Sequence, residues 1–271
     1  MVRSVRGAVV LVSGATGGLG AALCAEFGRH GARLVALDVD RERLDALVAT
    51  LAARGVEALA VAGDIADAAY VQGAVELALA RYGRVDGVVN NAGISCRSLL
   101  AGTEPAVIRR VMEVNFLGAA CLTQAALPAI LEHSGFVVAV SSVAGFSPLT
   151  GRTAYAASKH ALHGFFDSLR SEVEGAGVDV LLVCPSFIRT GIGSAALDGR
   201  GRPVATTRVT TGGESTPESV AAQIVSAVAA RQVLLLPDAT SRKAWWLNRL
   251  MPSLYARMMK RRVGSEFPGL S

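Results

Sequence analysis

The chain lacks the clustered cysteines and histidines that metal centres and disulfide frameworks require. Its 271 residues include four of each, scattered without the spacing of metal ligands. We therefore expect no metal, and we interpret the cysteines as buried free thiols of a protein from a reducing cytosol. The histidines are expected at the surface or in helix packing. The residues concerned are Cys24, Cys96, Cys121, Cys184, His30, His133, His160 and His163.

Long hydrophobic runs are also scarce, and so are acidic residues near the C-terminal end. No apolar run approaches the ~18 residues of a membrane-spanning helix, and residues 9–12 are too short for a secretory signal. These two absences predict a cytoplasmic protein. No acidic residue occurs between Ala239 and Ser265, where seven basic residues lie. The other 20 basic residues face 22 acidic ones, so the net charge of +5 belongs to this tail.

Hydrophobic residues, by contrast, are abundant at 51 % of the chain, and strand-like apolar runs alternate with helix-like segments. Continuous apolar strands are covered on both faces, and strands separated by helices form parallel sheets. The pattern predicts an α/β fold over residues 1–238: a doubly wound, Rossmann-like, about seven-stranded parallel sheet with helices on both faces. Strands are expected at residues 8–12, 32–37, 56–62, 87–89, 136–140, 178–183 and 232–236. Helices are expected from the loop after the first strand to residue 30, and at 41–54, 68–82, 104–132, 154–174 and 221–230.

Two segments differ from this pattern. Residues 192–215 are rich in glycine, serine, threonine and arginine, and we expect them to form a mobile lid, with a plain disordered loop as the alternative. Residues 239–271 are a basic extension with apolar residues at roughly helical spacing and a break at Pro252. This extension is expected to pack on the pocket or on another subunit, to lie on an anionic membrane, or to have no fixed structure.

A glycine-rich loop follows the first expected strand. Glycines let the backbone approach a pyrophosphate, and the next helix offers N–H groups and the positive end of its dipole. The spacing is GxxxGxG, which differs from the common GxGxxG fingerprint, and a simple tight turn is the alternative. The residues expected to contact a dinucleotide here are Gly14, Thr16, Gly17, Gly18, Leu19 and Gly20.

Acidic and amide side chains follow the next strands. Asp38 can accept hydrogen bonds from both hydroxyls of an adenosine ribose and repels a 2′-phosphate. Gly17 carries no charge to attract that phosphate, so NAD is favoured over NADP, although Arg41 and Arg43 lie close in the sequence. Contacts to the cofactor are also expected from Asp64, Ile65, Asn91, Ala92 and Gly93, because strand carboxyl ends line the ligand crevice of doubly wound sheets.

Tyr155 and Lys159 stand four residues apart in YAASK, and Ser142 precedes the tyrosine by thirteen residues. A spacing of four places both side chains on one face of a helix. A phenol titrates near pH ~10, and a neighbouring ammonium lowers that pKa, so the tyrosine can exchange protons nearer neutrality. The trio predicts a proton-transfer site for an alcohol or carbonyl. An exposed tyrosine stacked on a lysine stem is the alternative.

Together these residues resemble the short-chain dehydrogenase/reductase family in its single-domain form. The resemblance covers about residues 7–190 and lies in SGATGGLG, with Ser13 where threonine is usual, then NNAG, VNFLG, Ser142 and YAASK. It implies that Tyr155 exchanges the proton, that Lys159 lowers its pKa and holds the nicotinamide ribose, and that Ser142 orients the substrate oxygen. It further implies that Asn115 holds a water linked to Lys159, and that the chain forms a dimer or tetramer through its two long helices.

The resemblance also places residues beside the nicotinamide. Pro185, Ile188 and Thr190 would contact it, with both Tyr155 and Lys159 on its ribose side. Ser186 replaces the glycine that the family usually has after this proline, which leaves the backbone conformation there open.

The expected activity is hydride transfer between NAD(H) and a hydrophobic secondary alcohol or ketone. The segment 159–172 is similar to members that act on steroid-like substrates. We expect no arginine placed to bind a carboxylate, and no nucleic-acid motif occurs. Alternatives are an NAD-dependent epimerase or dehydratase and a non-catalytic redox-sensing module. The expected substrate pocket consists of Ile94, Cys96, Val143, Phe146, Leu149, Phe187 and Ile192.

Overall fold

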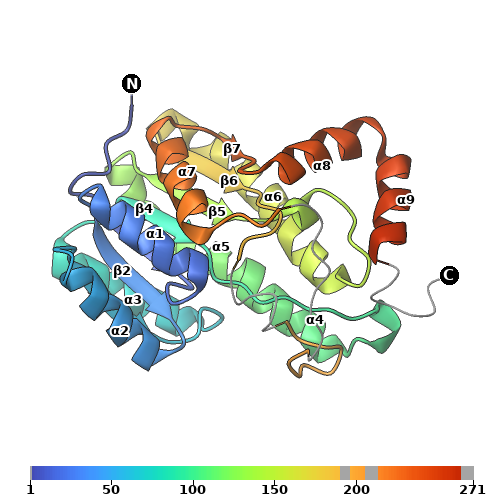
Figure 1. Cartoon of the computed structure of the whole chain (residues 1–271). Helices are drawn as coiled ribbons and strands as arrows, with labels where there is room; N and C mark the ends of the chain where they lie inside the picture. The colour runs from blue at the N-terminus through green and yellow to red at the C-terminus, as the bar shows by residue number, and fades with distance from the viewer. Residues whose placement is uncertain (1, 190–195, 205–212, 264–271) are drawn as a thin grey trace.

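The computed structural model describes residues 2–189, 196–204 and 213–263. Within them, parallel strands form one sheet in the order β3-β2-β1-β4-β5-β6-β7 (Figure 1). The chain fills the sheet outwards from β1 to β3 and then from β4 to β7, so the direction changes between β1 and β4. The strands are β1 (Val9–Ser13), β2 (Arg33–Asp38), β3 (Ala58–Ala62), β4 (Gly87–Asn90), β5 (Phe136–Val140), β6 (Asp179–Val183) and β7 (Leu234–Leu235).

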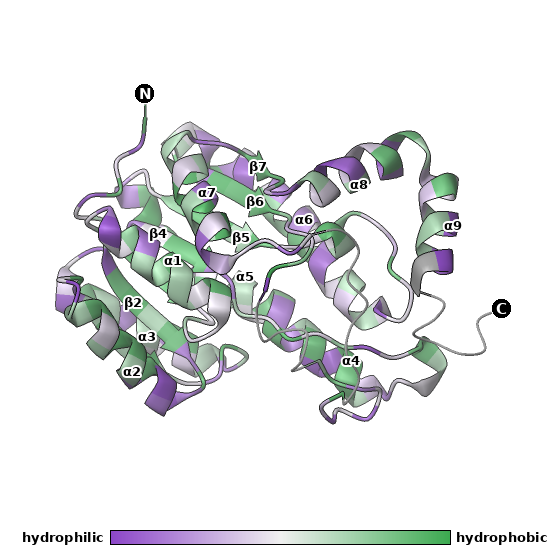
Figure 2. Ribbon diagram, viewed as in Figure 1, coloured by the Kyte–Doolittle hydropathy of each residue, from purple (hydrophilic) through white to green (hydrophobic). Residues whose placement is uncertain are grey.

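Helices cover both faces of this sheet, which confirms the predicted α/β fold. Alternate residues of β1 enter opposite cores: Val10 and Val12 pack with one set of helices, Val9 and Leu11 with the other. The first set is α1 (Gly18–Arg29), α2 (Arg41–Ala52) and α7 (Pro217–Ala229). The second set is α3 (Ala68–Tyr82), α5 (Gly118–Glu132) and α6 (Thr153–Val173). Apolar residues are concentrated on the strands between these two layers (Figure 2).

The long helix expected at 104–132 contains a local irregularity. It consists of α4 (Pro105–Met112), the π-helical turn η2 (Glu113–Leu117) and α5. A π turn inserts one extra residue and rotates the side chains that follow it, and such turns occur often at functional sites. Here the inserted turn contains Asn115.

The same helical segment corrects one expectation. Pro105–Glu132 is long and apolar enough to cross a membrane by length and composition, although no apolar run of that length was expected. In the structure its residues Leu122, Ala126 and Ile130 are fully buried against the sheet. The hydrophobicity of α5 is therefore that of a core helix.

The C-terminal extension forms two helices, α8 (Ala239–Leu250) and α9 (Pro252–Val263), joined at the predicted break. They form an arch that projects from the body of the molecule (Figure 1). Asp238 begins this arch with a capping box: its carboxylate accepts the Ser241 N–H, and the Ser241 hydroxyl accepts the Asp238 N–H in return.

Part of the segment expected to be a lid is described. Leu197 pairs with the chain near Cys96: its N–H donates to the Ser95 carbonyl, and its carbonyl accepts the Arg97 N–H. The Glu104 N–H also donates to the Gly199 carbonyl. Residues 196–204 are thus tied to the loop that follows β4, while the rest of the expected lid lies largely outside the described residues. Whether this segment moves stays a prediction.

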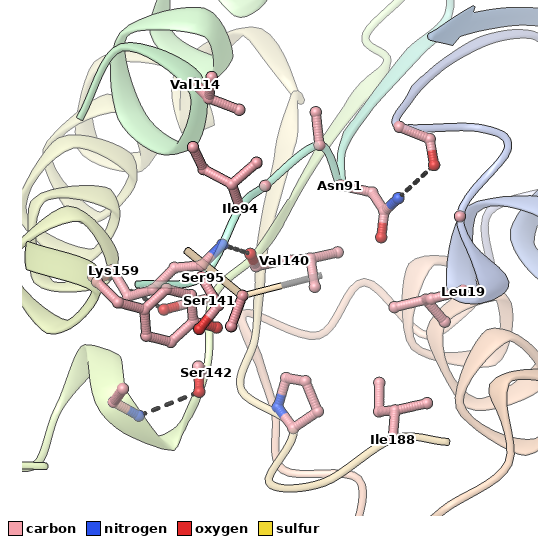
Figure 3. A pocket seen from close by; sticks show the side chains of 18 of the residues that line it. Leu19, Asn91, Ile94, Ser95, Val114, Val140, Ser141, Ser142, Lys159 and Ile188 are labelled. Atoms are coloured by element: carbon pink, nitrogen blue, oxygen red, sulfur yellow. Dashed lines mark hydrogen bonds between the residues drawn. The ribbon is translucent and has the colours of Figure 1, made fainter. Parts of the chain in front are cut away.

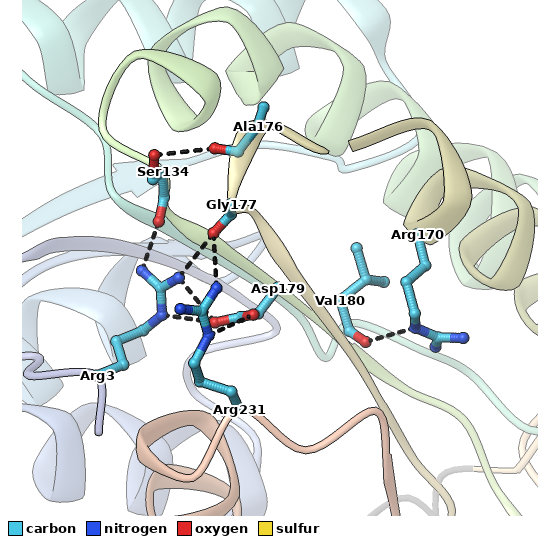
Figure 4. A network of polar contacts seen from close by, with 8 residues as sticks. All are labelled: Arg3, Ser134, Arg170, Ala176, Gly177, Asp179, Val180 and Arg231. Atoms are coloured by element: carbon cyan, nitrogen blue, oxygen red, sulfur yellow. Dashed lines mark hydrogen bonds and ion pairs between the residues drawn. The ribbon is translucent and has the colours of Figure 1, made fainter. Parts of the chain in front are cut away.

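An ion-pair network closes the edge of the sheet opposite the carboxyl ends of the strands (Figure 4). Asp179, at the start of β6, accepts from Arg3 Nε at 2.8 Å and from Arg231 Nε at 2.9 Å. Both guanidinium groups also donate to the Gly177 carbonyl. One carboxylate therefore joins the N-terminal segment, β6 and the turn that follows α7.

Replacing this carboxylate by an amide should lower stability and leave the distant cavity unaffected. Asp179→Asn would leave two guanidinium groups facing each other at a largely buried site, so we expect a loss of about 1–3 kcal/mol in the free energy of unfolding. Urea denaturation measures this loss. Asp45→Asn, at the exposed pair with Arg41, is the matched control and should change stability by less than about 0.5 kcal/mol. Equal effects of the two substitutions would contradict a special role for the network.

Candidate active site

A cavity of about 960 Å³ lies at the carboxyl ends of the parallel strands. The loops after β1, β2, β4, β5 and β6 line it, which is where doubly wound sheets bind ligands. Its volume is at the upper end of ligand pockets and suits a cofactor with a substrate beside it. The structure brings together in its lining most of the predicted site residues: Gly14, Thr16, Gly17, Gly18, Leu19, Gly20, Asp38, Asp64, Ile65, Asn91, Ala92, Gly93, Ser142, Tyr155, Lys159, Pro185 and Ile188.

The glycine loop fits a dinucleotide on steric grounds. Gly14 has a positive φ of 63°, and a Cβ there would lie 2.8 Å from Ala92 Cα. A Cβ on Gly20 would lie 2.0 Å from the Gly14 carbonyl oxygen, so neither position tolerates a side chain. Gly17 begins α1 without a side-chain cap. Gly18, Leu19 and Gly20 of the first helical turn line the cavity, so a pyrophosphate bound there would accept N–H groups from that helix end.

Ser13 and Asn91 join the glycine loop to the loop after β4. The Ser13 hydroxyl accepts the N–H groups of Asn91 and Ala92, both at 3.1 Å. The Asn91 amide donates to the Ser13 and Gly14 carbonyls, both at 3.0 Å. Serine in place of the usual threonine thus still forms the cross-link. Asn91 fixes the shape of the cavity floor and lies in its lining.

Asp38 lies where the adenosine ribose was expected. Its Oδ2 accepts the N–H of Thr16 at 2.9 Å and the hydroxyl of Thr16 at 2.7 Å. The two nearby arginines behave differently: Arg41 pairs with Asp45, whereas Arg43 donates to the Thr16 carbonyl and lines the cavity. An anionic and a cationic side chain therefore stand at the same end of the site.

Asp64 is oriented by its own loop and by α4. It accepts the Ala66 N–H at 3.0 Å and the Arg110 guanidinium at 2.7 Å. Partial burial acts to raise the pKa of Asp64, but the Ala66 amide and Arg110 together hold it below its ordinary value. The carboxylate is thus ionised at neutral pH. Arg110 also lines the cavity, and no sequence pattern indicated its pairing with Asp64.

The predicted proton-transfer trio converges on one wall of the cavity. Tyr155 and Lys159 lie on the first two turns of α6, and the Lys159 Nζ is 5.8 Å from the centre of the Tyr155 ring. Ser142 follows β5, and its hydroxyl accepts the Ala144 N–H at 3.1 Å. Figure 3 shows Ser142 and Lys159 on the wall opposite Leu19 of the glycine loop. A substrate oxygen near the trio would therefore lie across the cavity from the cofactor loop.

Lys159 is almost completely buried, with 4 % of its surface exposed. Its Nζ donates to the Val140 carbonyl at 2.8 Å. Burial lowers the pKa of Lys159 from 10.5 to about 8, because the charged ammonium loses its hydration. A buried lysine with a pKa near neutrality is typical of a residue held for chemistry.

Asn115 lies behind this wall and bonds to the backbone of Ile94. Its Oδ1 accepts the Ile94 N–H at 2.7 Å, while its Nδ2 donates to the Ile94 carbonyl and to the Ser158 hydroxyl. A Cβ on Gly93 would lie 3.3 Å from Asn115 Oδ1 and 3.6 Å from Lys159 Nζ. The π turn thus places Asn115 near Lys159. The water that the family resemblance implies here stays a prediction.

Ser186 connects the loop after β6 to the C-terminal arch. Its hydroxyl and its N–H both donate to the Asp238 carboxylate, at 2.7 and 3.0 Å. The backbone of Ser186 does not adopt a positive φ, so serine in place of glycine causes no strain. The same carboxylate caps α8, and the departure from the family pattern therefore anchors the arch.

The substrate end of the cavity differs in part from the prediction. Ile94, Val143, Leu149 and Phe187 line it as expected, and Ile192, like the cofactor residue Thr190, lies outside the described residues. The prediction for Cys96 was wrong, because this residue packs with Val107, Val111 and Ala154 in a small core. The prediction for Phe146 was also wrong, because its ring packs against the Trp245 ring, with 4.8 Å between the ring centres.

Sequence reasoning missed two groups of lining residues. Arg97 and Arg152 reach the cavity from separate loops, whereas the sequence pattern indicated no arginine placed to bind a carboxylate. The C-terminal arch contributes the second group: Thr240, Lys243, Ala244, Leu247, Tyr255, Met258 and Met259. Tyr255 is anchored through a 3.1 Å hydrogen bond with Ser147. The amphipathic spacing of the tail was the signal that could have revealed this second group.

A buried cluster behind the trio was also missed. His163 Nε2 lies 3.1 Å from the Ser141 hydroxyl and 3.5 Å from Cys184 Sγ. Burial lowers the pKa of His163 and raises the pKa of Cys184 to about 12. Both groups are therefore neutral at physiological pH, and the cluster supports Lys159 through the bond from Ser141 to its carbonyl.

Comparisons with known proteins agree with this geometry. The model of the short chain dehydrogenase family matches residues 8–201. The chain therefore belongs to the short-chain dehydrogenase/reductase family of oxidoreductases, which confirms the resemblance seen in the sequence.

Among its relatives are two proteins from animals. "Dehydrogenase/reductase SDR family member 7B" of Bos taurus is 39 % identical over 97 % of this chain and 83 % of the relative. "Dehydrogenase/reductase SDR family protein 7-like" of Anopheles gambiae is 36 % identical over 96 % of this chain and 84 % of the relative.

Solved structures show the same fold. A short-chain dehydrogenase/reductase from Burkholderia phymatum, solved in complex with NAD, is 28 % identical with a TM-score of 0.83, over 93 % of this chain and 96 % of the other. An alcohol dehydrogenase from Thermococcus sibiricus, complexed with 5-hydroxy-NADP, is 22 % identical with a TM-score of 0.73. It matches over 84 % of this chain and 95 % of its own.

The burial of Lys159 predicts a pH-dependent cost in stability. In the unfolded chain the lysine titrates near 10.5 and in the folded protein near 8, so the unfolded state binds more protons between these values. The cost is full below pH 8 and fades as the pH rises towards 10.5. Lys159→Met does not carry this cost. Its free energy of unfolding minus that of wild type should therefore fall by on the order of a few kcal/mol as the pH rises from 8 to 10.

Denaturant unfolding at several pH values measures this difference. Lys243→Met, at an exposed lysine, is the matched control and should differ from wild type by the same amount at each pH. A Lys159→Met difference that stays constant with pH would contradict the effect of burial.

Proposed function

We propose that the protein transfers a hydride between NAD(H) and a hydrophobic secondary alcohol or ketone. The observation that carries this proposal is that Ser142, Tyr155 and Lys159 line the same cavity as the glycine loop and Asp38. A non-catalytic redox-sensing module would not need the trio. An epimerase or dehydratase would use the same trio, but nothing in the cavity favours it.

The cofactor supplies the hydride chemistry when it is bound. Tyr155 donates its phenolic proton to the substrate oxygen during reduction and accepts that proton during oxidation. The Lys159 ammonium favours the phenolate form through its charge, and the Ser142 hydroxyl orients the substrate oxygen and stabilises its developing charge. Asn115 acts as a positioning residue, since it fixes the Ile94 backbone against the substrate end.

The preference for NAD rests on Asp38. Thr16 fixes the Asp38 carboxylate at the ribose end, where a 2′-phosphate would be repelled. The Burkholderia phymatum relative was solved in complex with NAD, which agrees with binding of a nicotinamide dinucleotide. Arg43 is the competing feature, because its guanidinium lines the same end of the cavity.

The substrate class rests on the composition of the cavity beyond the trio. Leu149, Phe187, Leu247, Met258 and Met259 give this end a predominantly apolar lining, which favours a lipophilic molecule. Arg97 and Arg152 add cationic groups, which favour a substrate that also carries an electron-rich substituent. We further propose a cytoplasmic homo-oligomer formed through α5 and α6, as the family resemblance implies.

Removing the phenolic hydroxyl tests the proposed chemistry. Tyr155→Phe should lower kcat by at least about 10³-fold, since it removes the acid–base group, while NADH affinity changes little. Turnover with a panel of lipophilic alcohols and ketones measures the first effect, and NADH fluorescence titration measures the second. Tyr82→Phe, outside the cavity, is the matched control and should keep wild-type turnover. Turnover by Tyr155→Phe near the wild-type rate would overturn the assignment.

Substituting Asp38 tests the cofactor preference. Asp38→Ser should lower the ratio of kcat/KM for NAD to that for NADP by at least about tenfold, or about 1.4 kcal/mol, because the repulsion of a 2′-phosphate is lost. Steady-state kinetics with each cofactor measure this ratio. Asp45→Asn, on the outer face of α2, serves as the control. A wild-type enzyme that already prefers NADP would show that Arg43 outweighs Asp38.

A further inference from the structure

The outer surface of the C-terminal arch has a composition found nowhere else on the described chain. Four large apolar residues are exposed around the bend between α8 and α9: Trp246 by 62 %, Leu250 by 72 %, Met251 by 49 % and Leu254 by 41 %. The other exposed large apolar residues of the described chain are Leu77 and Leu79 on α3 and residues at separate places elsewhere. We call these four residues the apolar bend, and Figure 2 shows hydrophobic colouring where α8 meets α9.

Packing inside the molecule does not account for the apolar bend. The inner faces of the two helices line the cavity with Ala244, Leu247, Tyr255, Met258 and Met259. Ser186 holds the start of the arch through Asp238, and the Asn248 side chain bonds to the Phe146 carbonyl at 2.6 Å. The arch is therefore fixed with its inner face towards the cavity, and the apolar bend remains on the outside.

Basic side chains surround the apolar bend. Six exposed cations lie on α8 and α9, with no acidic residue between Ala239 and Val263. In the part of the chain that the structure describes, the ion pairs with carboxylates involve other arginines. The six are Arg242, Lys243, Arg249, Arg257, Lys260 and Arg261, of which Lys243 also lines the cavity.

This combination points to one kind of partner. We propose that the arch docks on an anionic lipid bilayer, with the apolar bend inserted at the interface and the surrounding cations on lipid phosphates. Trp246 has the amphipathic ring that favours the headgroup region, and apolar insertion together with a basic cluster supplies the two contributions that stable peripheral binding requires.

Charge argues against a second copy of the chain as the occupant. A symmetric contact through this surface would place the same cations opposite one another, which is unfavourable. An anionic bilayer neutralises them instead. The docked arch would have the bilayer on its outer face and the cavity on its inner face, so a lipophilic substrate would have a short path between them.

Vesicle co-sedimentation of the full chain tests this proposal without requiring any activity. Binding to vesicles of phosphatidylcholine mixed with phosphatidylserine should exceed binding to phosphatidylcholine alone by at least about tenfold and should weaken as salt rises. Equal binding to both vesicle types, or binding to neither, would overturn the proposal.

Two sets of variants separate the apolar and the electrostatic contributions. The triple variant Trp246→Gln, Leu250→Gln, Leu254→Gln should lose at least about tenfold in vesicle affinity, and Arg257→Gln with Arg261→Gln should do the same. None of these five residues lines the cavity.

The matched controls carry the same changes at exposed positions elsewhere: Leu77→Gln, Leu79→Gln, Val233→Gln for the apolar set, and Arg6→Gln, Arg54→Gln for the basic set. Equal losses in the test and control variants would contradict docking through the arch.

The two tryptophans allow the inserted residue to be identified. Trp245 packs between Phe146 and Arg249, whereas Trp246 points outwards in the apolar bend. With anionic vesicles, Trp245→Phe, which leaves only Trp246, should show blue-shifted emission and quenching by brominated lipids. Trp246→Phe should show neither change.

Light scattering addresses the alternative occupant. If the apolar triple variant dissociates an oligomer that the wild type forms in solution, the surface is an interface between copies and the membrane proposal fails.

Discussion

The arrangement of the active site depends on keeping one ammonium group out of water. Lys159 is buried at the base of the cavity wall, and desolvation alone would favour its neutral form. The structure compensates with the Val140 carbonyl and with neutral groups behind the wall, since the pKa values of His163 and Cys184 are both displaced so that neither is charged. A second cation in this region would further disfavour the ammonium. The chemistry proposed for Tyr155 thus depends on the neutrality of residues that do not line the cavity with it.

This burial requires residues from several strands and helices to lie close together. Val140 lies at the end of β5, Lys159 on the second turn of α6, and Asn115 in the π turn before α5. Asn115 and Lys159 meet beside Gly93, where a Cβ would crowd Asn115 and touch Lys159. The irregular turn in an otherwise regular helix therefore has a structural reason: it delivers a polar side chain to a place where the helix would otherwise present an apolar face.

The sequence allowed prediction of those features that depend on local pattern. Apolar runs and helical segments are bounded by turn and capping residues. The strand β5 and the helix α3 were therefore predicted at their observed bounds. Tyr155 and Lys159 were found because their spacing is itself a local pattern. Arg97, Arg152 and Arg110 were missed because they reach the cavity from segments distant in the sequence, and no periodicity marks such a convergence. Cys96 and Phe146 were misplaced for the same reason: an apolar residue beside a site can face the cavity or a core, and the backbone path decides which.

The C-terminal arch shows how one substitution can connect two parts of a site. In a family that usually has glycine after Pro185, this chain has Ser186, which gives Asp238 a hydroxyl donor as well as an amide donor. Asp238 in turn caps α8, whose inner face lines the substrate end. The orientation of α8 is thereby fixed from the loop after β6, which also lines the cavity through Pro185, Phe187 and Ile188. Any displacement of the arch would pull on that loop, so the position of the arch and the shape of this part of the cavity are mechanically coupled.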